Sequence, residues 1–425
     1  SETRNRRIHR MKIIKKAGVT SSSVTAALGF TPRRKAGVVT VTFADGTQEE
    51  FVPSANTDAA RGLALEAAMA VATAWSTVDL SPGNYDVAKA TSTVIAVATH
   101  YSVLAGMTIR LNGARLYHGA GFNGAVFFGA DAVDDWSLIG PGRIEGTGTA
   151  STTPPSGTNE IGLNCRTCRR WRVQNISFQL FKNVGMQVNN SSYIGHGTTL
   201  SANLKISTGI VIGCNFDYNK IGMANYAGSE YISFSGCTFN NNATACDINA
   251  GNTKFVGCEV SGNANYGLLI RNGGNDGHGC FVGGHITHNV GFAIYAEASM
   301  DAGFLINGTT IGGDSGSANK IESAGGGLNL VNCYVESPFY AASTATGLNF
   351  MTGCFIAGTY TVTTDLSSAE RLKWVFEGNY TLTGGWAQND TQIYVFADNA
   401  AAITGGLTAG RRYRKTTTNE VCEVV

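Results

Sequence analysis

The stretches IVIGCNFDYNKIGM (residues 210–223), ISFSGCTFNNNATACDI (232–248) and FVGCEVSGNANYGLLI (255–270) follow one pattern. In each, alternating apolar residues lead into Gly-Cys, and a polar turn separates them from a second apolar stretch. The Gly-Cys pairs stand 23 and then 21 residues apart. A repeat of this length predicts a solenoid, in which each unit stacks on its neighbours and shares a continuous core with them.

Weaker copies of the unit occupy residues 281–296, 328–335 and 348–356, so the repeat extends from about residue 173 to residue 380. Apolar residues make up 43% of the 425-residue chain, charged residues make up only 14%, and there are 54 glycines. Period-two alternation predicts strands, and glycine and asparagine suit the tight turns between strands. The sequence therefore predicts an all-β fold.

The net charge of +1 indicates no nucleic-acid partner for the chain as a whole. Lysines and arginines cluster in residues 4–16, without interleaved aromatic residues. We interpret this segment as a solvated or partner-docked tail rather than a nucleic-acid-binding arm. No signal peptide and no run of 18 apolar residues occurs, so we expect no membrane insertion.

Two ladders of identical residues are expected inside the solenoid. Cysteines take the same place in their repeats at Cys214, Cys237, Cys258, Cys333 and Cys354. A free cysteine behaves as a compact hydrophobe, so these side chains are expected to stack in the core. Asparagines recur at the polar turn, at Asn219, Asn242, Asn263 and Asn289. Their amides are expected to bond from unit to unit, as in other stacked strands.

Cys165 and Cys168 form a Cys-x-x-Cys pair, which is half of a zinc or redox site. No second pair and no suitably spaced histidine accompanies it. We therefore predict no metal site and no cofactor. The thiol-rich core favours assembly in a reducing cytoplasm.

The chain divides into three expected segments. Residues 1–53 form an attachment module, in which GVVTVTFADGTQEEFVP predicts a hairpin that turns at Asp-Gly. Residues 54–380 form the solenoid. A helix capped at Thr57 and ending near Ala74 is expected to cover the open end of its core. Residues 381–425 form a hairpin-like C-terminal module.

The segments TDAARGLALEAAMAV (57–71), STVDLSPGNYDV (76–87) and WSLIGPGRIEGTG (136–148) resemble the first coils of pectate-lyase-like and polygalacturonase-like proteins. With the later repeats, this resemblance covers residues 54 to about 380. It implies a right-handed, single-stranded parallel β-helix with an N-terminal capping helix.

The catalytic motifs of these families do not carry over. Asn-Thr-Asp at residues 56–58 lies in the expected cap, and Asp-Asp at 134–135 lies in an early coil. Gly-His-Gly at 195–197 and at 277–279 lacks the rest of the polygalacturonase set. The calcium-binding aspartates and the catalytic arginine of pectate lyases are not recognisable either.

Two further segments resemble bacteriophage tail fibre and tailspike proteins, VTAALGFTP (24–32) and LTAGRRYRKTTTNEVCEVV (407–425). Their joint occurrence around a β-helix implies a homotrimeric virion protein. Such a protein attaches to other tail or baseplate proteins through its N-terminus, here residues 1–53, and meets a host-surface glycan with its β-helix.

The residue after each buried cysteine is expected to point outward, because alternate residues of a strand face opposite sides. This register forms one outward column of Asn215, Thr238, Glu259, His285, Thr310 and Tyr334. Coils stack about 4.8 Å apart, so Glu259 and His285 are expected to be neighbours. We interpret them either as an acid/base pair in a sugar groove or as a surface ion pair.

Function is also expected where the repeat breaks, at residues 149–160 and 271–280, since loops often carry functional residues. Within RNGGNDGHGC (271–280), Asp276 and His278 are candidates for a general acid and base, and Arg271 is a candidate glycan-binding residue. The alternative is a glycine-rich corner with solvated side chains.

Tyr266 and Tyr295 are candidate sugar-stacking residues, although aromatic residues also serve in cores and trimer contacts. Glycoside hydrolysis needs two carboxylates about 5–5.5 Å apart for retention, or about 6.5–9.5 Å apart for inversion. The sequence does not choose among the outward candidates Asp217, Glu230, Asp247, Glu259, Asp276 and Glu297.

The sequence thus predicts a phage tailspike or tail fibre, located in the virion, that binds host-surface polysaccharide during adsorption. It does not decide whether the protein also cleaves that polysaccharide, as a hydrolase or as a lyase. Two alternatives stay open: a non-catalytic structural fibre, and a free bacterial polysaccharide lyase or hydrolase.

Overall fold

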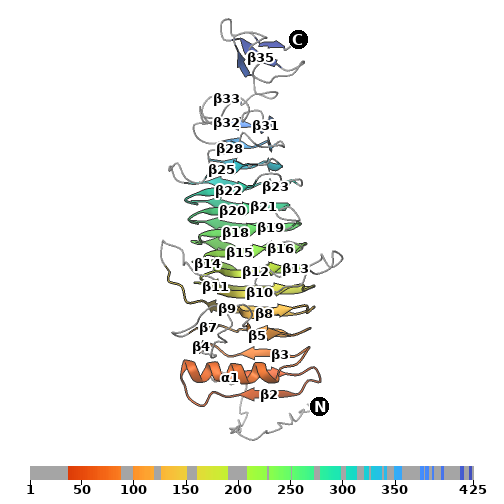
Figure 1. Cartoon of the computed structure of the whole chain (residues 1–425), viewed down its shortest axis with the longest axis vertical. Coiled ribbons are helices and arrows are strands. Elements are labelled where there is room, and N and C mark those ends of the chain that lie inside the picture. Colours follow the sequence, from red (N-terminus) through yellow and green to blue (C-terminus); the bar gives the residue numbers. More distant parts are fainter. Residues whose placement is uncertain are drawn as a thin grey trace, which may run out of the picture.

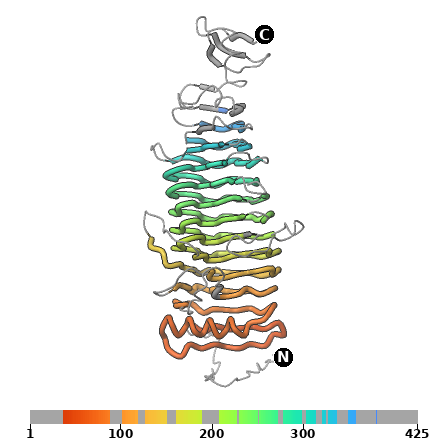
Figure 2. The backbone as a smooth tube through the Cα atoms, viewed as in Figure 1, coloured from red at the N-terminus to blue at the C-terminus, as the bar shows by residue number. Residues whose placement is uncertain are grey.

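The protein is one long stack of β-coils, with a helix at one end and the C-terminal strands at the other (Figure 1). The computed structural model describes residues 37–87, 99–118, 126–150, 160–189, 208–226, 229–249, 251–271, 278–297, 303–313, 320–324, 327–336, 339–341, 349–356, 374–377, 379–381, 385–386, 394–396, 412–415 and 421–423. Within these ranges the backbone forms evenly stacked turns (Figure 2).

Each full coil has three strands, which form faces 1, 2 and 3 of the stack. Faces 1 and 2 belong to one sheet and share four long strands, β9 (Ser137–Glu145), β11 (Trp171–Gln179), β19 (Thr253–Ser261) and β21 (Gly279–Thr287). The first half of each long strand lies in face 1 and the second half lies in face 2.

The other strands of face 1 are β3 (Thr77–Leu80), β6 (Thr108–Arg110), β13 (Gly209–Ile212), β16 (Ile232–Ser235), β23 (Phe304–Asn307), β26 (Leu328–Val331), β29 (Asn349–Thr352) and β31 (Trp374–Glu377). Those of face 2 are β4 (Gly83–Asp86), β7 (Ala114–Tyr117), β14 (Asn215–Asp217), β17 (Thr238–Asn240), β24 (Thr310–Gly312), β27 (Tyr334–Val335), β30 (Phe355–Ile356) and β32 (Tyr380–Thr381).

Face 3 is a second sheet, made of β5 (Thr99–Val103), β8 (Val126–Asp131), β10 (Ile161–Arg166), β12 (Val184–Asn189), β15 (Ile221–Asn225), β18 (Thr244–Ile248), β20 (Tyr266–Ile270), β22 (Phe292–Ala296), β25 (Lys320–Ser323) and β28 (Phe339–Ala341). Consecutive coils pair in parallel on all three faces. The right-handed parallel β-helix that the sequence predicted is therefore confirmed.

Aromatic side chains stack from coil to coil in the core. On face 2, the Phe216 ring lies 5.3 Å from that of Phe178 and 4.9 Å from that of Phe239, and all three are fully buried. On face 1, the rings of Phe234 and Phe255 stack at 5.1 Å. Because each ring packs on the next coil, the apolar core extends along the stack.

The first corner, between faces 1 and 2, explains the Gly-Cys pairs. Gly236 and Gly257 have φ of 57° and 59°, and a Cβ at either position would meet no atom within 4 Å. The left-handed backbone, rather than a lack of space, therefore favours glycine there. The cysteine that follows is buried, and Cys237 Sγ donates to the carbonyl of Val211 on the preceding coil at 3.6 Å. The predicted cysteine ladder is confirmed at all five positions, Cys214, Cys237, Cys258, Cys333 and Cys354.

The second corner, between faces 2 and 3, contains the predicted asparagine ladder. The backbone N–H of Asn219 donates to Asn242 Oδ1 at 2.9 Å, and that of Asn242 donates to Asn263 Oδ1 at 2.9 Å. Asn242 Nδ2 also donates to the carbonyl of Phe216 at 2.8 Å. All four asparagines are buried, including Asn289, so each amide satisfies backbone groups that water does not reach.

The N-terminal end closes as expected. Helix α1 (Asp58–Val71) begins at Thr57, whose Oγ1 accepts the N–H of Ala60 at 3.3 Å, and it ends three residues before the expected position. Strands β1 (Val39–Thr42) and β2 (Gln48–Phe51) form the predicted hairpin. Because β1 also pairs antiparallel with β3, the hairpin continues the sheet of face 1. Residues 1–36 lie outside the described residues, so the attachment role of residues 1–53 stays a prediction.

At the other end, β35 (Arg412–Lys415) and β36 (Val421–Glu423) form an antiparallel hairpin, and β33 (Gly385–Trp386) and β34 (Tyr394–Phe396) precede them. Among the described residues, no helix has the length and apolarity that a membrane span requires.

The asparagine ladder leads to a test of stability. We expect Asn242→Ala to lower the free energy of unfolding by about 3 kcal/mol, because it leaves buried N–H and C=O groups of two coils without partners. Urea unfolding followed by circular dichroism measures the change. Asn215→Ala, on the exposed side of the neighbouring strand, should change it by less than about 1 kcal/mol. Equal effects of the two variants would contradict a structural role of the ladder.

Candidate functional site

Face 2 presents an outward column of polar side chains in register. The strand pairings place Asn215 beside Thr238, and Glu259 beside both Thr238 and His285. The predicted adjacency of Glu259 and His285 is therefore confirmed, and both side chains are exposed. We name as the polar stripe the residues Arg143, Ser177, Asn215, Thr238, Glu259, His285 and Thr310.

A second outward column runs beside the polar stripe, two residues further along each strand. It consists of Glu145, Gln179, Asp217, Asn240, Ser261 and Thr287. At its N-terminal end, the buried carboxylate of Glu145 binds Arg143 at 2.9 Å and Arg115 at 2.5 Å. The two columns together form a straight surface rich in hydrogen-bonding groups.

Asp217 differs electrostatically from the other carboxylates of this surface. Its burial raises the pKa of its carboxyl to about 6, and the negative charge of Glu259 contributes to the increase. Gln179, whose amide donates to Asp217 Oδ2 at 3.5 Å, and the cation of Arg143 oppose the increase. Asp217 therefore keeps its proton to a higher pH than an ordinary aspartate and can act as a general acid.

The sequence named six outward carboxylates without choosing among them. On this surface the structure couples two of them electrostatically, Asp217 on β14 and Glu259 on β19. One coil separates their strands, which corresponds to about 10 Å along the stack. No spacing in the sequence signals the half-buried environment of Asp217, which depends on side chains from neighbouring coils.

Face 3 brings together both predicted sugar-stacking residues. The ring of Tyr266 lies 5.4 Å from that of Phe292 and 5.6 Å from that of Tyr295, and the Phe292 and Tyr295 rings are 5.1 Å apart. All three are half-buried. This aromatic cluster lies on a different face from the polar stripe, so the structure does not unite the two groups.

Arg271 forms ion pairs with two carboxylates. Its Nε donates to Asp247 Oδ1 at 2.6 Å, and another guanidinium nitrogen donates to Glu297 Oε1 at 3.0 Å. Asp247 is 2% exposed, and its burial raises the pKa of its carboxyl against the effect of Arg271. Because both carboxylates compensate its charge, Arg271 links neighbouring coils, and its role in glycan binding stays a prediction.

His278 is separate from Glu259 and His285. His278 directly precedes β21, at the third corner between face 3 and the next coil of face 1. Its imidazole covers Gly251, where a Cβ would lie 2.0 Å from Cε1. His285 lies in the face 2 half of the same strand, and Asp276 lies outside the described residues. The described candidates Glu259, His278 and His285 therefore do not form a single group.

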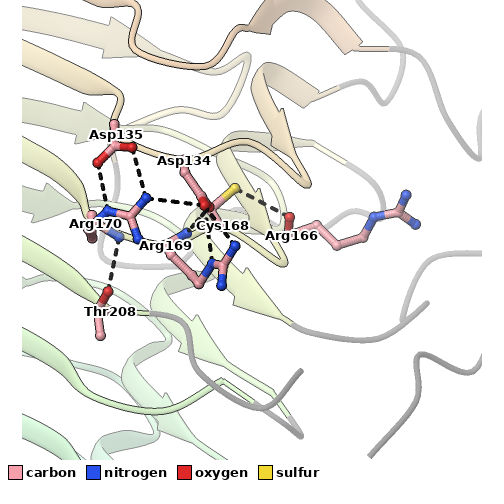
Figure 3. Close-up of polar contacts among 7 residues, drawn as sticks. All are labelled: Asp134, Asp135, Arg166, Cys168, Arg169, Arg170 and Thr208. Atoms are coloured by element: carbon pink, nitrogen blue, oxygen red, sulfur yellow. Dashed lines mark hydrogen bonds and ion pairs between the residues drawn. The ribbon is translucent and has the colours of Figure 1, made fainter. Parts of the chain in front are cut away.

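The Asp-Asp pair of the sequence is part of an ion-pair network at the third corner (Figure 3). Arg170 donates to both carboxylate oxygens of Asp135, at 2.7 and 2.9 Å, and Arg169 binds Asp134 at 3.0 Å. Both aspartates are thus engaged with the next coil. Beside them, Cys168 Sγ donates to the carbonyl of Arg166 at 3.3 Å, and its burial raises the pKa of its thiol to about 11.

No protein-family model matches the chain, and no curated protein matches it. Among solved structures, the A-module of mannuronan C-5 epimerase AlgE4 from Azotobacter vinelandii has a TM-score of 0.50 and 10% identity, over 78% of this chain and 85% of that one. The tailspike protein of E. coli bacteriophage HK620, in complex with a pentasaccharide, has a TM-score of 0.48 and 12% identity, over 75% and 65%. At 10% identity the likeness to the epimerase module shows the fold alone.

The shifted pKa of Asp217 predicts a pH-dependent stability. Its folded-state pKa is about 6 against an ordinary value of 3.8, so its ionisation destabilises the folded state as pH rises from about 4 to about 6. We expect Asp217→Asn to raise the thermal midpoint at about pH 8 and to leave it unchanged at about pH 3. Differential scanning calorimetry measures both. Ser261→Ala, in the same column, should show no such pH-dependent difference; a gain for Asp217→Asn that is equal at both pH values would refute the assignment.

Proposed function

We propose that this protein is a receptor-binding protein of the phage tailspike type, whose β-helix binds a host-surface polysaccharide along the polar stripe. The observation that supports this most is the shape of the stripe. Hydrogen-bonding side chains recur once per coil, about every 4.8 Å, in a straight line along the stack. A polymer with hydroxyl groups on every unit presents hydrogen-bonding groups at a similar repeat, whereas a small ligand would contact only a short part of so extended a surface.

The comparisons are compatible with this class of ligand. By its name, the epimerase with a TM-score of 0.50 acts on mannuronan, which is a polysaccharide. The virion part of the proposal depends on the two segments, residues 24–32 and 407–425, that resemble phage tail proteins. We propose location in the virion after assembly in the host cytoplasm, with residues 1–53 attaching to other tail or baseplate proteins.

We also propose that the protein is a homotrimer. Face 1 supports this, because it exposes the apolar side chains of Ile210, Val256 and Phe350 on separate coils. Two further copies of the chain, aligned in parallel, present the same coil repeat to this face. Analytical ultracentrifugation should give three times the chain mass, and the mass of one chain would refute the trimer.

Binding along the polar stripe is tested on an array of bacterial O-antigen and capsular polysaccharides. We expect the double variant Asn215→Ala, Thr238→Ala to bind its best polysaccharide roughly tenfold more weakly than the wild type, because it removes two hydrogen-bonding groups. The matched control Ser233→Ala, Ser235→Ala changes outward polar residues of face 1 on the coil that carries Thr238, and it should bind normally. Equal losses in both variants would exclude the stripe as the binding surface.

A second candidate function, hydrolysis of the bound polysaccharide, is favoured by the electrostatic coupling of Asp217 and Glu259. A half-buried acid with a pKa of about 6 can protonate the leaving oxygen, while the exposed carboxylate activates water. Their separation of about 10 Å along the stack is far above the narrow spacing of a retaining hydrolase and lies near the upper limit of the wider spacing of an inverting one.

Cleavage is measured as new reducing ends after incubation with the polysaccharide that binds best. We expect Asp217→Asn and Glu259→Gln each to lower the rate at least about a hundredfold, since each removes one partner of the acid/base pair. Binding by both variants should persist. Full activity in both variants would refute this pair, and retained binding without cleavage by the wild type would leave an adhesin. A 4,5-unsaturated product would instead indicate a lyase.

A further inference from the structure

The third corner carries a row of residues that no repeat in the sequence reveals. The pairings of face 1 place these residues in register, each two positions before a paired strand residue: Trp75, Gly106, Asp135, Arg170, Thr208, Tyr231 and Asn252. All except Thr208 have a left-handed backbone, with φ between 53° and 67°. We call these seven residues the corner row.

A left-handed backbone is unfavourable for bulky residues. The first corner has the same requirement and meets it only with small or permissive residues, namely Asn175, Gly213, Gly236, Gly257, Gly283, Gly308, Asn332 and Gly353. The second corner, which borders the column of Asp217, mixes both kinds. Backbone geometry therefore does not explain Trp75, Arg170 and Tyr231 in the corner row, and strain of this sort often accompanies a binding role.

The structure holds Trp75 rigidly while leaving it open to solvent. Its backbone N–H donates to the carbonyl of Ala105 at 2.8 Å, and its ring covers Gly106, where a Cβ would lie 2.3 Å from two ring atoms. Only glycine permits this close packing. The residue is nevertheless 62% exposed, so the indole presents a fixed surface to solvent. Tyr231, further along the row, is 49% exposed, and its carbonyl accepts the N–H of Gly209.

Charge-balanced ion pairs lie between these two aromatic residues. Asp134 and Asp135 bind Arg169 and Arg170, as Figure 3 shows, and the N–H of Arg170 donates to Thr208 Oγ1 at 3.0 Å. Two carboxylates opposite two guanidinium groups give no net charge. They still offer donors and acceptors to a ligand, which suits hydroxyl groups better than an ionic group.

We propose that the corner row is a second saccharide-binding surface, which stacks uncharged sugar rings on Trp75 and Tyr231 and bonds their hydroxyl groups through the Asp–Arg pairs. Rigid aromatic rings supply large contact areas at little entropic loss, and the CH groups on one side of a pyranose pack well against them. The row runs along the stack like the polar stripe, so it suits the same kind of polymer. This inference depends on the proposed function, because it assumes a polysaccharide ligand.

The test uses asparagine, which tolerates the left-handed backbone and already occurs in the row at Asn252. Trp75→Asn and Tyr231→Asn are each expected to bind uncharged polysaccharides of the same array at least tenfold more weakly than the wild type. Their thermal midpoints should equal or exceed that of the wild type, because the backbone strain is relieved. Trp75→Phe should retain most of the binding. The matched control is Leu63→Gln, which changes an exposed apolar residue of α1, outside the corner row. It should change neither the binding nor the thermal midpoint.

Each alternative has its own signature. Unchanged binding by both asparagine variants, with or without a lower midpoint, overturns the inference and leaves packing as the role of the row. A changed sedimentation mass also overturns it, since the row would then contact another copy of the chain. If Trp75→Asn does not fold, Tyr231→Asn decides the matter. Wild-type protein that binds no polysaccharide overturns the proposed function itself, whereas normal wild-type binding with unaffected variants overturns only the corner row.

Discussion

Contact between successive coils holds this protein together, and the asparagine ladder of the second corner shows the constraint most clearly. Asn242 Oδ1 accepts the N–H of Asn219, and the N–H of Asn242 donates to Asn263 Oδ1, so these buried amides bond from coil to coil. Stacked phenylalanines such as Phe216 and Phe239 repeat this dependence in apolar form. A single coil can neither satisfy its polar groups nor bury its core. Register between coils is therefore strongly determined along the described stack.

Strict register also decides what kind of surface the protein can present. Once the inward residues are aligned, the outward residues fall into straight columns, because side chains alternate along each strand. The polar stripe and the column of Asp217 are two such columns. A linear, repeating surface suits a linear, repeating ligand, and this is the physical link between the fold and the proposed polysaccharide.

The three corners differ in how they meet the same backbone demand. The first uses glycine and asparagine, the second follows its left-handed residue with a buried amide, and the third accepts Trp75 and Tyr231. Where the backbone requirement alone selects the residue, as at Gly236, the position is architectural. Where a bulky residue occupies a left-handed position, backbone geometry does not account for the choice of residue, and a role of the side chain does.

The sequence by itself determined the coil repeat, the cysteine and asparagine ladders, the capping helix and the adjacency of Glu259 and His285, because regular spacing along a solenoid translates directly into neighbours. Only the tertiary structure showed the burial that raises the pKa of Asp217, because that burial depends on side chains of other coils. The corner row was equally hidden. Its members stand 21 to 38 residues apart, since the segments between them vary in length, and only the pairing of strands aligns them.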